Sequence, residues 1–297
     1  MRLDEYIKQE QSIRGGIHFK NGVWWRQTTI GRCHPLYPMQ RIILGDASPK
    51  YSKSFFGYWY LVNDIDKANS QRSFMMLSKE KLKTFCYEGL SHEKRKAINK
   101  ASRNGIVVKK IFQLEDHWKS MQAVFKSTAR RTQYGLPEEY YTEKEEEWKM
   151  RLRVEFALPN RDWFGVWKGQ ELLGYLYSCL IDDMAFLLVT KFNSDFLDLR
   201  PSDALHYHIL EYYRDQPDCY MVTAGENNPM VSSIDRFKKG YGFEVVNYPS
   251  VSIVNRVAKN VIRVVLDSAT LVVKERTDSK RNLRYQLETM RNSLNNW

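Results

Sequence analysis

Short hydrophobic runs separated by polar breaks fill the stretch from residue 163 to residue 248. The first run, 163–167, is rich in aromatic and β-branched residues, and the polar break 168–171 after it is typical of a hairpin. The runs 172–181 and 184–190 are almost continuously apolar, as in strands that are buried on both faces. The pattern therefore predicts a hairpin followed by a third, largely buried strand.

Apolar residues take up helical spacing after this third strand. The spacing predicts a helix from Pro201 to about Arg214, and Pro201 suits its first turn because the missing N–H is not needed there. A strand at 220–223, a loop at 225–229 and a helix capped by Ser232 or Ser233 follow. A closing strand at 244–248 should end at Pro249.

This order of elements, with Phe237-Lys238 ahead of Gly242-Phe243, resembles the GNAT acyltransferases and particularly their FemAB-like branch. The basic stretch 90–101, followed by 105–108, is similar to the helix that leads from the first lobe of FemAB-like proteins into the second. The resemblance covers about half the chain. It implies an α/β fold with a GNAT-like mixed, twisted sheet flanked by helices.

Three regions follow from these patterns. Residues 1–89 favour a β-rich N-terminal lobe, because 23–25 and 55–62 read as strands, and the resemblance implies an extension or a truncated first GNAT lobe there. Residues 90–266 form the GNAT-like domain with its basic entry helix. Residues 267–297 predict a C-terminal amphipathic helix that docks on the parent domain or, alternatively, forms a homodimer.

The charge of the chain indicates anionic partners. The 297 residues carry a formal net charge of +11, which attracts polyanions. The segment 91–110 is strongly basic, and its charges predict contacts with the phosphates of coenzyme A or of tRNA, or else the solvated face of a helix. The candidate residues are Lys94, Arg95, Lys96, Lys100 and Arg103.

Several classes of protein fit the sequence poorly. No apolar run approaches the roughly 20 residues of a membrane helix, and the polar N-terminus is unlike a signal peptide, so we expect a cytoplasmic protein. His206 and His208 are two residues apart on a helix and point to different faces, so no metal site is expected. The cysteines are too scattered for a zinc site or a disulfide framework and are expected to be reduced packing residues: Cys33, Cys86, Cys179 and Cys219.

The resemblance also implies where an acyl donor binds. In GNAT enzymes the third and fourth strands splay apart around an acyl thioester, and its phosphates sit at the N-terminus of the following helix. The family's phosphate loop has small residues where this chain has Asp203 and Leu205, and the aspartate places a negative charge beside a phosphate. FemAB-like members depart from this loop as well, and some use aminoacyl-tRNA. The implied acyl-CoA contacts are Thr190, Lys191, Arg200 and Ser202.

Candidate catalytic and acceptor groups lie in the loops. Attack by an amine on an acyl carbonyl needs a base and a proton donor, and Glu226 and Tyr241 are the candidates. The resemblance implies that Lys238 binds an acidic acceptor or a donor phosphate. Arg130 and Arg131 begin a polar interruption of the helical stretch 113–158, which either lines an acceptor pocket or is an ordinary turn.

The sequence thus predicts a GNAT-like N-acyltransferase that moves an acyl or aminoacyl group from acyl-CoA, or from aminoacyl-tRNA, to an amine. The alternative is a catalytically degenerate GNAT-fold protein that binds nucleic acid or another anionic ligand.

Overall fold

The chain folds into two compact units, each with most of its contacts inside itself. The computed structural model describes residues 1–13, 17–20, 23–27, 32–35, 39, 41–42, 57–132, 136–227, 232–255 and 260. The first unit takes in Met1–Tyr6, Ser73–Thr132 and Leu136–Val246, and the second takes in the described residues of Ile7–Arg72 and Asn247–Trp297.

The predicted hairpin lies within the sheet of the first unit. β8 (Asp162–Lys168) and β9 (Glu171–Ile181) pair antiparallel, and Gly169 makes their turn with a φ of +59°. The strand order is β6 (Ser70–Leu77), β11 (Met221–Glu226), β10 (Met184–Phe192), β9, β8 and β7 (Ile106–Lys110). Neighbours are antiparallel except β10 and β11, which are parallel.

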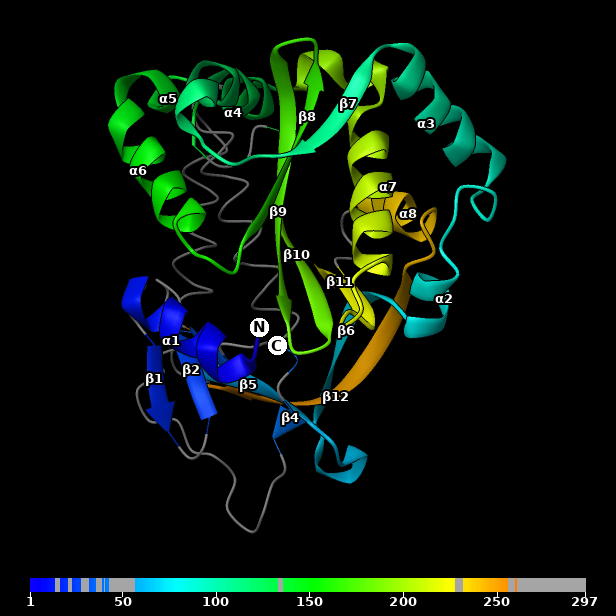
Figure 1. Ribbon diagram of the computed structural model, residues 1–297. Coiled ribbons are helices and arrows are strands. Elements are labelled where there is room, and N and C mark those ends of the chain that lie inside the picture. Colours follow the sequence, from blue (N-terminus) through cyan, green and yellow to red (C-terminus); the bar gives the residue numbers. More distant parts are fainter. Residues whose placement is uncertain are drawn as a thin grey trace. The chain divides into compact units, whose positions relative to one another are not determined.

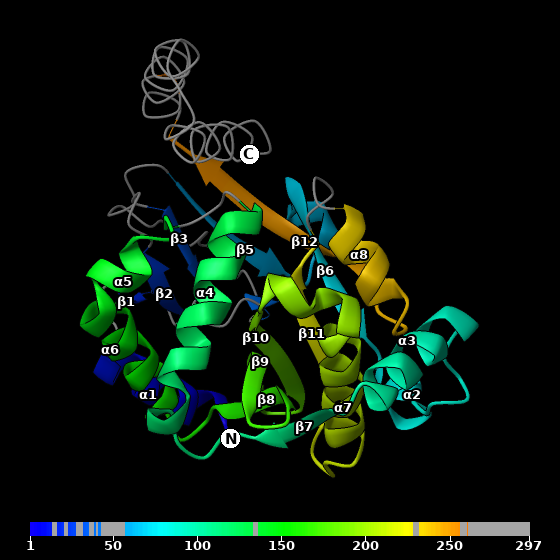
Figure 2. The same cartoon turned by 90° about the horizontal axis from the view of Figure 1, so that it is seen from above.

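Helices cover both faces of this sheet (Figures 1 and 2). The first face is covered by α2 (Lys79–Lys83), α3 (His92–Arg103), α7 (Pro201–Arg214) and α8 (Ser232–Lys239). The other face is covered by α4 (Trp118–Thr132), α5 (Tyr140–Glu143) and α6 (Glu145–Phe156). The short 3-10 helices of this unit are η2 (Glu115–His117) and η3 (Ser194–Leu199).

Strand alternation fills both cores. Trp163 packs with the α4 and α6 side chains, whereas its neighbour Phe164 packs with those of α3 and α7. Successive side chains of a strand point to opposite faces, so a continuously apolar strand such as β9 supplies both cores at once.

The starts of α3 and α7 follow from local chemistry. The Ser91 hydroxyl caps α3 by accepting from the Lys94 N–H. Arg200 adopts the left-handed conformation, with a φ of 64°, and turns the chain out of η3 so that Pro201 opens α7.

The second unit is mainly β-structure. Its elements are β1 (Ile17–Lys20), β2 (Val23–Gln27), β3 (Arg32–Pro35), β4 (Arg41–Ile42), β5 (Gly57–Val62) and η1 (Ile65–Lys67), with the part of α1 (Leu3–Ile13) from Ile7 on and the part of β12 (Glu244–Val254) from Asn247 on. The strand order is β1, β2, β3, β5 and β12, and β4 also pairs with β5. The core centres on Trp25, whose ring meets Tyr58 and Tyr60 edge-on.

The predicted α/β class and the order of elements from the hairpin to the closing strand are confirmed. Two local predictions are wrong, and one helix was missed. The strand β11 continues through Gly225 to Glu226, where a loop was expected, and β12 runs past Pro249 to Val254. Pro249 is tolerated because the pairing with β5 begins only at Ser250. The helix α1 was not predicted.

The helix expected at 267–297 lies outside the described residues. The domain boundary at residue 89 stays a prediction.

Gly174 is required by the close approach of β9 to β10. A Cβ there would lie 2.5 Å from Phe192 Cδ1 and 2.6 Å from the Lys191 carbonyl oxygen, which cannot rotate away. We expect Gly174→Ala to lower the free energy of unfolding by about 1–3 kcal/mol, measured by urea denaturation. Gly89→Ala is the control, because its nearest contact would be an ordinary 3.5 Å to Cys86 Sγ. Equal stabilities of the two variants would contradict this account.

Candidate active site

β10 and β11 diverge after a short paired segment. They pair at three successive positions, which are Met184 with Met221, Ala185 with Val222 and Phe186 with Thr223. Beyond Phe186, β10 continues to Phe192 without further pairing to β11 among the described residues. We call this place the β10/β11 divergence.

Both strands are irregular where they part. The pairing of β10 with β9 shifts register between Leu187 and Val189, and the pairing of β11 with β6 shifts between Thr223 and Glu226. In β11, Gly225 has a φ of 86°, and the Thr223 hydroxyl accepts from its N–H at 3.2 Å. Bulges of this kind bend strands and redirect side chains beside functional sites.

Lys238 reaches this divergence from α8. Its Nζ donates to the Ala224 carbonyl oxygen at 2.8 Å, one residue beyond the last β11 position that pairs with β10. The side chain is partly buried, and desolvation lowers the pKa of Lys238. A desolvated cation therefore lies at the edge of the divergence.

The N-terminus of α7 holds a buried carboxylate. Asp203 Oδ1 accepts from Lys94 Nζ at 2.9 Å and from the Tyr241 hydroxyl at 2.9 Å. Arg200 Nη1 lies 3.9 Å from Oδ2. The Asp203 side chain is 3% exposed and the Lys94 side chain 15% exposed. The positive end of α7 is thus compensated by the chain's own carboxylate.

Aromatic rings complete this cluster. Lys94 Nζ lies 3.7 Å from the centroid of the Phe237 ring and 4.4 Å from that of Tyr241. These are cation–π distances. Lys94 therefore ties α3 to α7 and also to the residues at and after the end of α8.

Tyr241 and Glu226, the two predicted catalytic residues, are placed differently. Tyr241 is 1% exposed, and its hydroxyl contacts both the carboxylate and the carbonyl oxygen of Asp203. Burial and the nearby carboxylate raise the pKa of Tyr241 far above its ordinary value. This geometry gives the hydroxyl a structural task. Glu226 is exposed and lies opposite Phe74 of β6. The catalytic roles of both residues stay predictions.

His206 is a member of the cluster that the sequence analysis did not single out as functional. Its Nδ1 lies 2.8 Å from the Ser202 carbonyl oxygen, and its ring packs edge-on against Phe237. Burial lowers the pKa of His206 to about 4. The imidazole is therefore neutral at neutral pH, and Ser202 serves here as a backbone acceptor.

Arg130 and Arg131 hold the loop that follows β10. Arg130 pairs with Glu138 at 2.7 Å and with Asp195 at 3.0 Å, and Arg131 Nε donates to Ser194 Oγ at 2.9 Å. The contacts with Asp195 and Ser194 fix η3, the 3-10 helix between β10 and α7.

Lys191 lies on the diverging part of β10. Burial lowers the pKa of Lys191, and the positive charge of Arg131 lowers it further. Thr190, its neighbour, is partly buried and lies opposite Leu176 of β9. Lys191 and Arg131 are thus near enough to interact electrostatically, and together they form a positively charged region beside η3.

The five predicted polyanion contacts on α3 separate into two groups. Lys94 points inward to Asp203, whereas Arg95, Lys96 and Arg103 line a hollow on the outer side. Lys100 is exposed and is not among the residues that line this hollow. Helical spacing could have shown the split, because Lys94 is three and seven residues before the buried Ala97 and Ala101.

Cys86, Cys179 and Cys219 are free thiols. No cluster of three or more metal-ligating side chains occurs among the described residues. Within the same residues, no helix is both long and apolar enough to cross a membrane.

Comparison with known proteins identifies the fold. No protein-family model matches the chain, and no curated protein sequence does. Two solved structures resemble it over most of their length. FemX gives a TM-score of 0.54 at 10% identity, covering 83% of this chain and 90% of FemX. The C-terminal domain of a putative lysylphosphatidylglycerol synthetase from Agrobacterium fabrum gives 0.52 at 11% identity, covering 86% and 92%.

The chain has the FemAB-like GNAT fold. The resemblance inferred from the order of elements is thereby confirmed at the level of the fold. Within this fold, β10 and β11 are the pair of strands that the GNAT resemblance expects to splay apart.

The buried ion pair gives a measurable coupling. Removing one partner of a buried pair leaves the other charge uncompensated and costs about 3 kcal/mol or more. We expect Lys94→Met and Asp203→Asn each to lower the free energy of unfolding strongly. The loss of unfolding free energy in the double variant should be smaller than the sum of the two single losses by at least about 1 kcal/mol. Lys81→Met with Glu244→Gln is the matched surface pair and should show no such coupling. A coupling near zero for Lys94 and Asp203 would contradict the geometry.

His206 gives a pH dependence with a definite sign. Its folded pKa of about 4 lies below the ordinary value of 6.5, so the unfolded chain binds a proton first as the pH falls. Stability from this group is present above pH 6.5 and is lost as the pH falls toward 4.

We expect His206→Gln to remove part of the acid destabilisation. Between about pH 7.5 and about pH 5, the wild type should lose about 2 kcal/mol more stability than the variant does. Urea denaturation at the two pH values measures this difference, and parallel losses would show that folding does not lower the pKa of His206.

Proposed function

We propose that the chain is a transferase that moves an aminoacyl group from an RNA-linked ester to an amine, with the chemistry at the β10/β11 divergence. The observation that carries this proposal is the desolvated Lys238 ammonium beside the bulge of β11. The FemAB-like GNAT fold supports acyl transfer as the general class of reaction.

Lys238 has the chemistry that acyl transfer needs. When an amine attacks an ester carbonyl, the new C–N bond forms and the carbonyl oxygen becomes negative. The ester C–O bond then breaks, its electron pair leaves with the alcohol oxygen, and a proton passes from the amine to that oxygen through water. A preorganised ammonium in a site of low dielectric stabilises the negative oxygen strongly. Lys238 already holds one acceptor, Ala224 O, and has further N–H groups for a second.

The position of the Asp203 carboxylate favours an RNA-linked ester as the acyl donor over a coenzyme A thioester. The diphosphate of coenzyme A would sit at the N-terminus of α7 if it bound as the GNAT resemblance implies. There the Asp203 carboxylate is buried and bound to Lys94 and Tyr241. A diphosphate would meet a helix end whose positive field is already compensated. An RNA-linked ester places no diphosphate at this helix.

The acceptor side of the site is cationic. Lys191 and Arg131 lie close enough for each to oppose the other's charge, and Lys191 has no carboxylate partner among the described residues. Two neighbouring cations, one of them partly desolvated, favour an acceptor that carries an anionic group beside its amine. One of the two similar structures belongs to a putative lysylphosphatidylglycerol synthetase, whose name describes an aminoacyl product.

The first test is the release of amino acid from charged tRNA. We expect the wild type to release labelled amino acids from a mixture of aminoacylated tRNAs in the presence of small amines that carry a carboxylate or a phosphate. Lys238→Met should reduce the rate by about 10²–10³, the typical loss of one oxyanion donor. Activity should also fall at an alkaline pH below the ordinary lysine pKa of about 10.4, because burial lowers the pKa of Lys238.

Lys239→Met is the matched control. Lys239 is the exposed neighbour at the same end of α8, so the variant loses the same charge without touching β11. Equal rates for both variants would remove Lys238 from the mechanism. Saturable binding of acetyl-CoA by the wild type would return the donor to the thioester class.

A further inference from the structure

The helix α3 has two faces with different tasks. Its inner face packs Ala97 and Ala101 into the core and carries Lys94 to Asp203. Its outer face follows the spacing i, i+3, i+4, i+7, i+10 and i+11, which keeps six side chains on one stripe of a helix. These side chains are His92, Arg95, Lys96, Asn99, Ser102 and Arg103.

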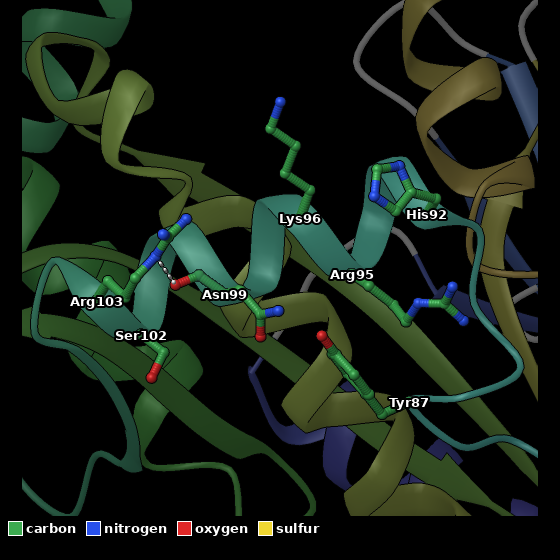
Figure 3. Close-up of a pocket in the computed structure, with 7 residues that line it drawn as sticks. All are labelled: Tyr87, His92, Arg95, Lys96, Asn99, Ser102 and Arg103. Atoms are coloured by element: carbon green, nitrogen blue, oxygen red, sulfur yellow. Dashed lines mark hydrogen bonds between the residues drawn. The ribbon is translucent and has the colours of Figure 1, made fainter.

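The outer stripe borders a hollow of about 420 Å³. Tyr87 lines the hollow together with the α3 side chains, and its hydroxyl points toward the helix near Asn99 and Arg95 (Figure 3). Tyr87 is held from behind, because its ring meets the Tyr207 ring of α7 edge-on at 6.2 Å. The hollow is therefore built from two segments of the first unit that share α7 as their support.

The charge of this hollow is not neutralised by carboxylates. Arg95 Nη1 donates to the Glu88 carbonyl oxygen at 2.8 Å, and Arg103 Nε donates to the Asn99 carbonyl oxygen at 3.4 Å. Neither these two residues nor Lys96 has a carboxylate partner among the described residues, and no acidic residue lines the hollow. The backbone contacts orient the two guanidinium groups and leave N–H groups for another acceptor.

We propose that this hollow binds the phosphodiester backbone of RNA. Arginine and lysine hold phosphates, asparagine and serine add hydrogen bonds to phosphate or ribose, and a tyrosine offers a ring edge and a hydroxyl. In the proposed reaction the hollow holds the RNA of the donor, so this role rests on the proposed function. The binding itself does not depend on turnover.

RNA fits the hollow better than a membrane surface does. A helix that lies on a bilayer buries an apolar face beside its basic one. From Lys79 to Asn104, every residue of which is described, no large hydrophobic side chain is exposed. The apolar face of α3 is already used in the core, so the outer stripe has only charge and hydrogen bonds to offer.

The inner face of α3 connects the hollow to the proposed chemistry. Lys94 binds Asp203 at the start of α7, and the Phe237 and Tyr241 rings cover Lys94. Lys238 follows Phe237 directly and reaches β11. RNA on the outer face of α3 would thus bind the helix whose inner face packs, through Lys94, against the Phe237 ring next to Lys238.

Fluorescence anisotropy with deacylated, labelled tRNA tests the hollow directly. We expect the triple variant Arg95→Gln, Lys96→Gln, Arg103→Gln to weaken binding at least about tenfold at moderate salt. Its plot of log affinity against log KCl concentration should be less steep by about one unit for each phosphate contact that is lost.

The control is the triple variant Lys119→Gln, Lys144→Gln, Arg151→Gln. It removes the same charge from exposed positions of the segment 118–156, whose helices cover the other face of the sheet from α3, and should bind tRNA almost as the wild type does. Equal weakening of both triple variants would overturn the proposal, because net charge alone would then explain the binding. An unchanged affinity of the α3 variant would also overturn it.

Two further measurements separate the alternatives. Co-sedimentation with phosphatidylglycerol vesicles would overturn the proposal if the α3 variant lost vesicle binding but kept tRNA binding. Lys238→Met should lose transfer and keep tRNA affinity. If the wild type transfers nothing from aminoacyl-tRNA, the proposed function fails, while the anisotropy comparison still decides whether the hollow binds RNA.

Discussion

The buried carboxylate of Asp203 is the contact on which the arrangement of the first unit depends. A carboxylate in this position costs several kcal/mol unless it is paired and hydrogen-bonded. Here Lys94 and Tyr241 both reach the same oxygen, and the N-terminus of α7 adds its positive field. The burial of Asp203 in the first turn of α7 therefore depends on α3 and on the turn after α8, which supply its two partners. One charge thus links three segments that are far apart in the sequence.

The same packing sets the electrostatics near the β10/β11 divergence. Burial keeps His206 neutral at neutral pH and lowers the pKa values of Lys191 and Lys238. Desolvated cations are costly for a protein, and neither lysine has a carboxylate within bonding distance among the described residues. Lysines with lowered pKa values often occur where an anionic ligand or a developing negative charge compensates them. They support the proposed transferase over the alternative of a catalytically degenerate scaffold.

Periodicity predicted the elements well and the site only in part. The hairpin, α3 and α7 follow from apolar spacing and from residues such as Ser91 and Pro201 that start helices. Lys238 became a candidate through the Phe-Lys pair of the family resemblance, and its role stays a proposal. The contact of Tyr241 with Asp203 could not be read from the sequence, because it joins residues 38 positions apart. Pairing beyond Pro249 likewise depends on the partner strand β5, which local patterns do not reveal.

The two faces of α3 explain why a strongly basic helix belongs to this fold. A charge run that served only solubility would need no inward lysine and no outward hollow. In this chain Lys94 pairs with the carboxylate at the N-terminus of α7, and the outer stripe keeps its charges for the RNA phosphates that we propose it binds. The carboxylate of Asp203 occupies the place at the N-terminus of α7 where an anion was expected, and Lys94 of α3 pairs with it. The other side of α3 carries the cationic residues that line the hollow. A donor whose phosphates lie along an RNA backbone suits that arrangement better than one with a single diphosphate.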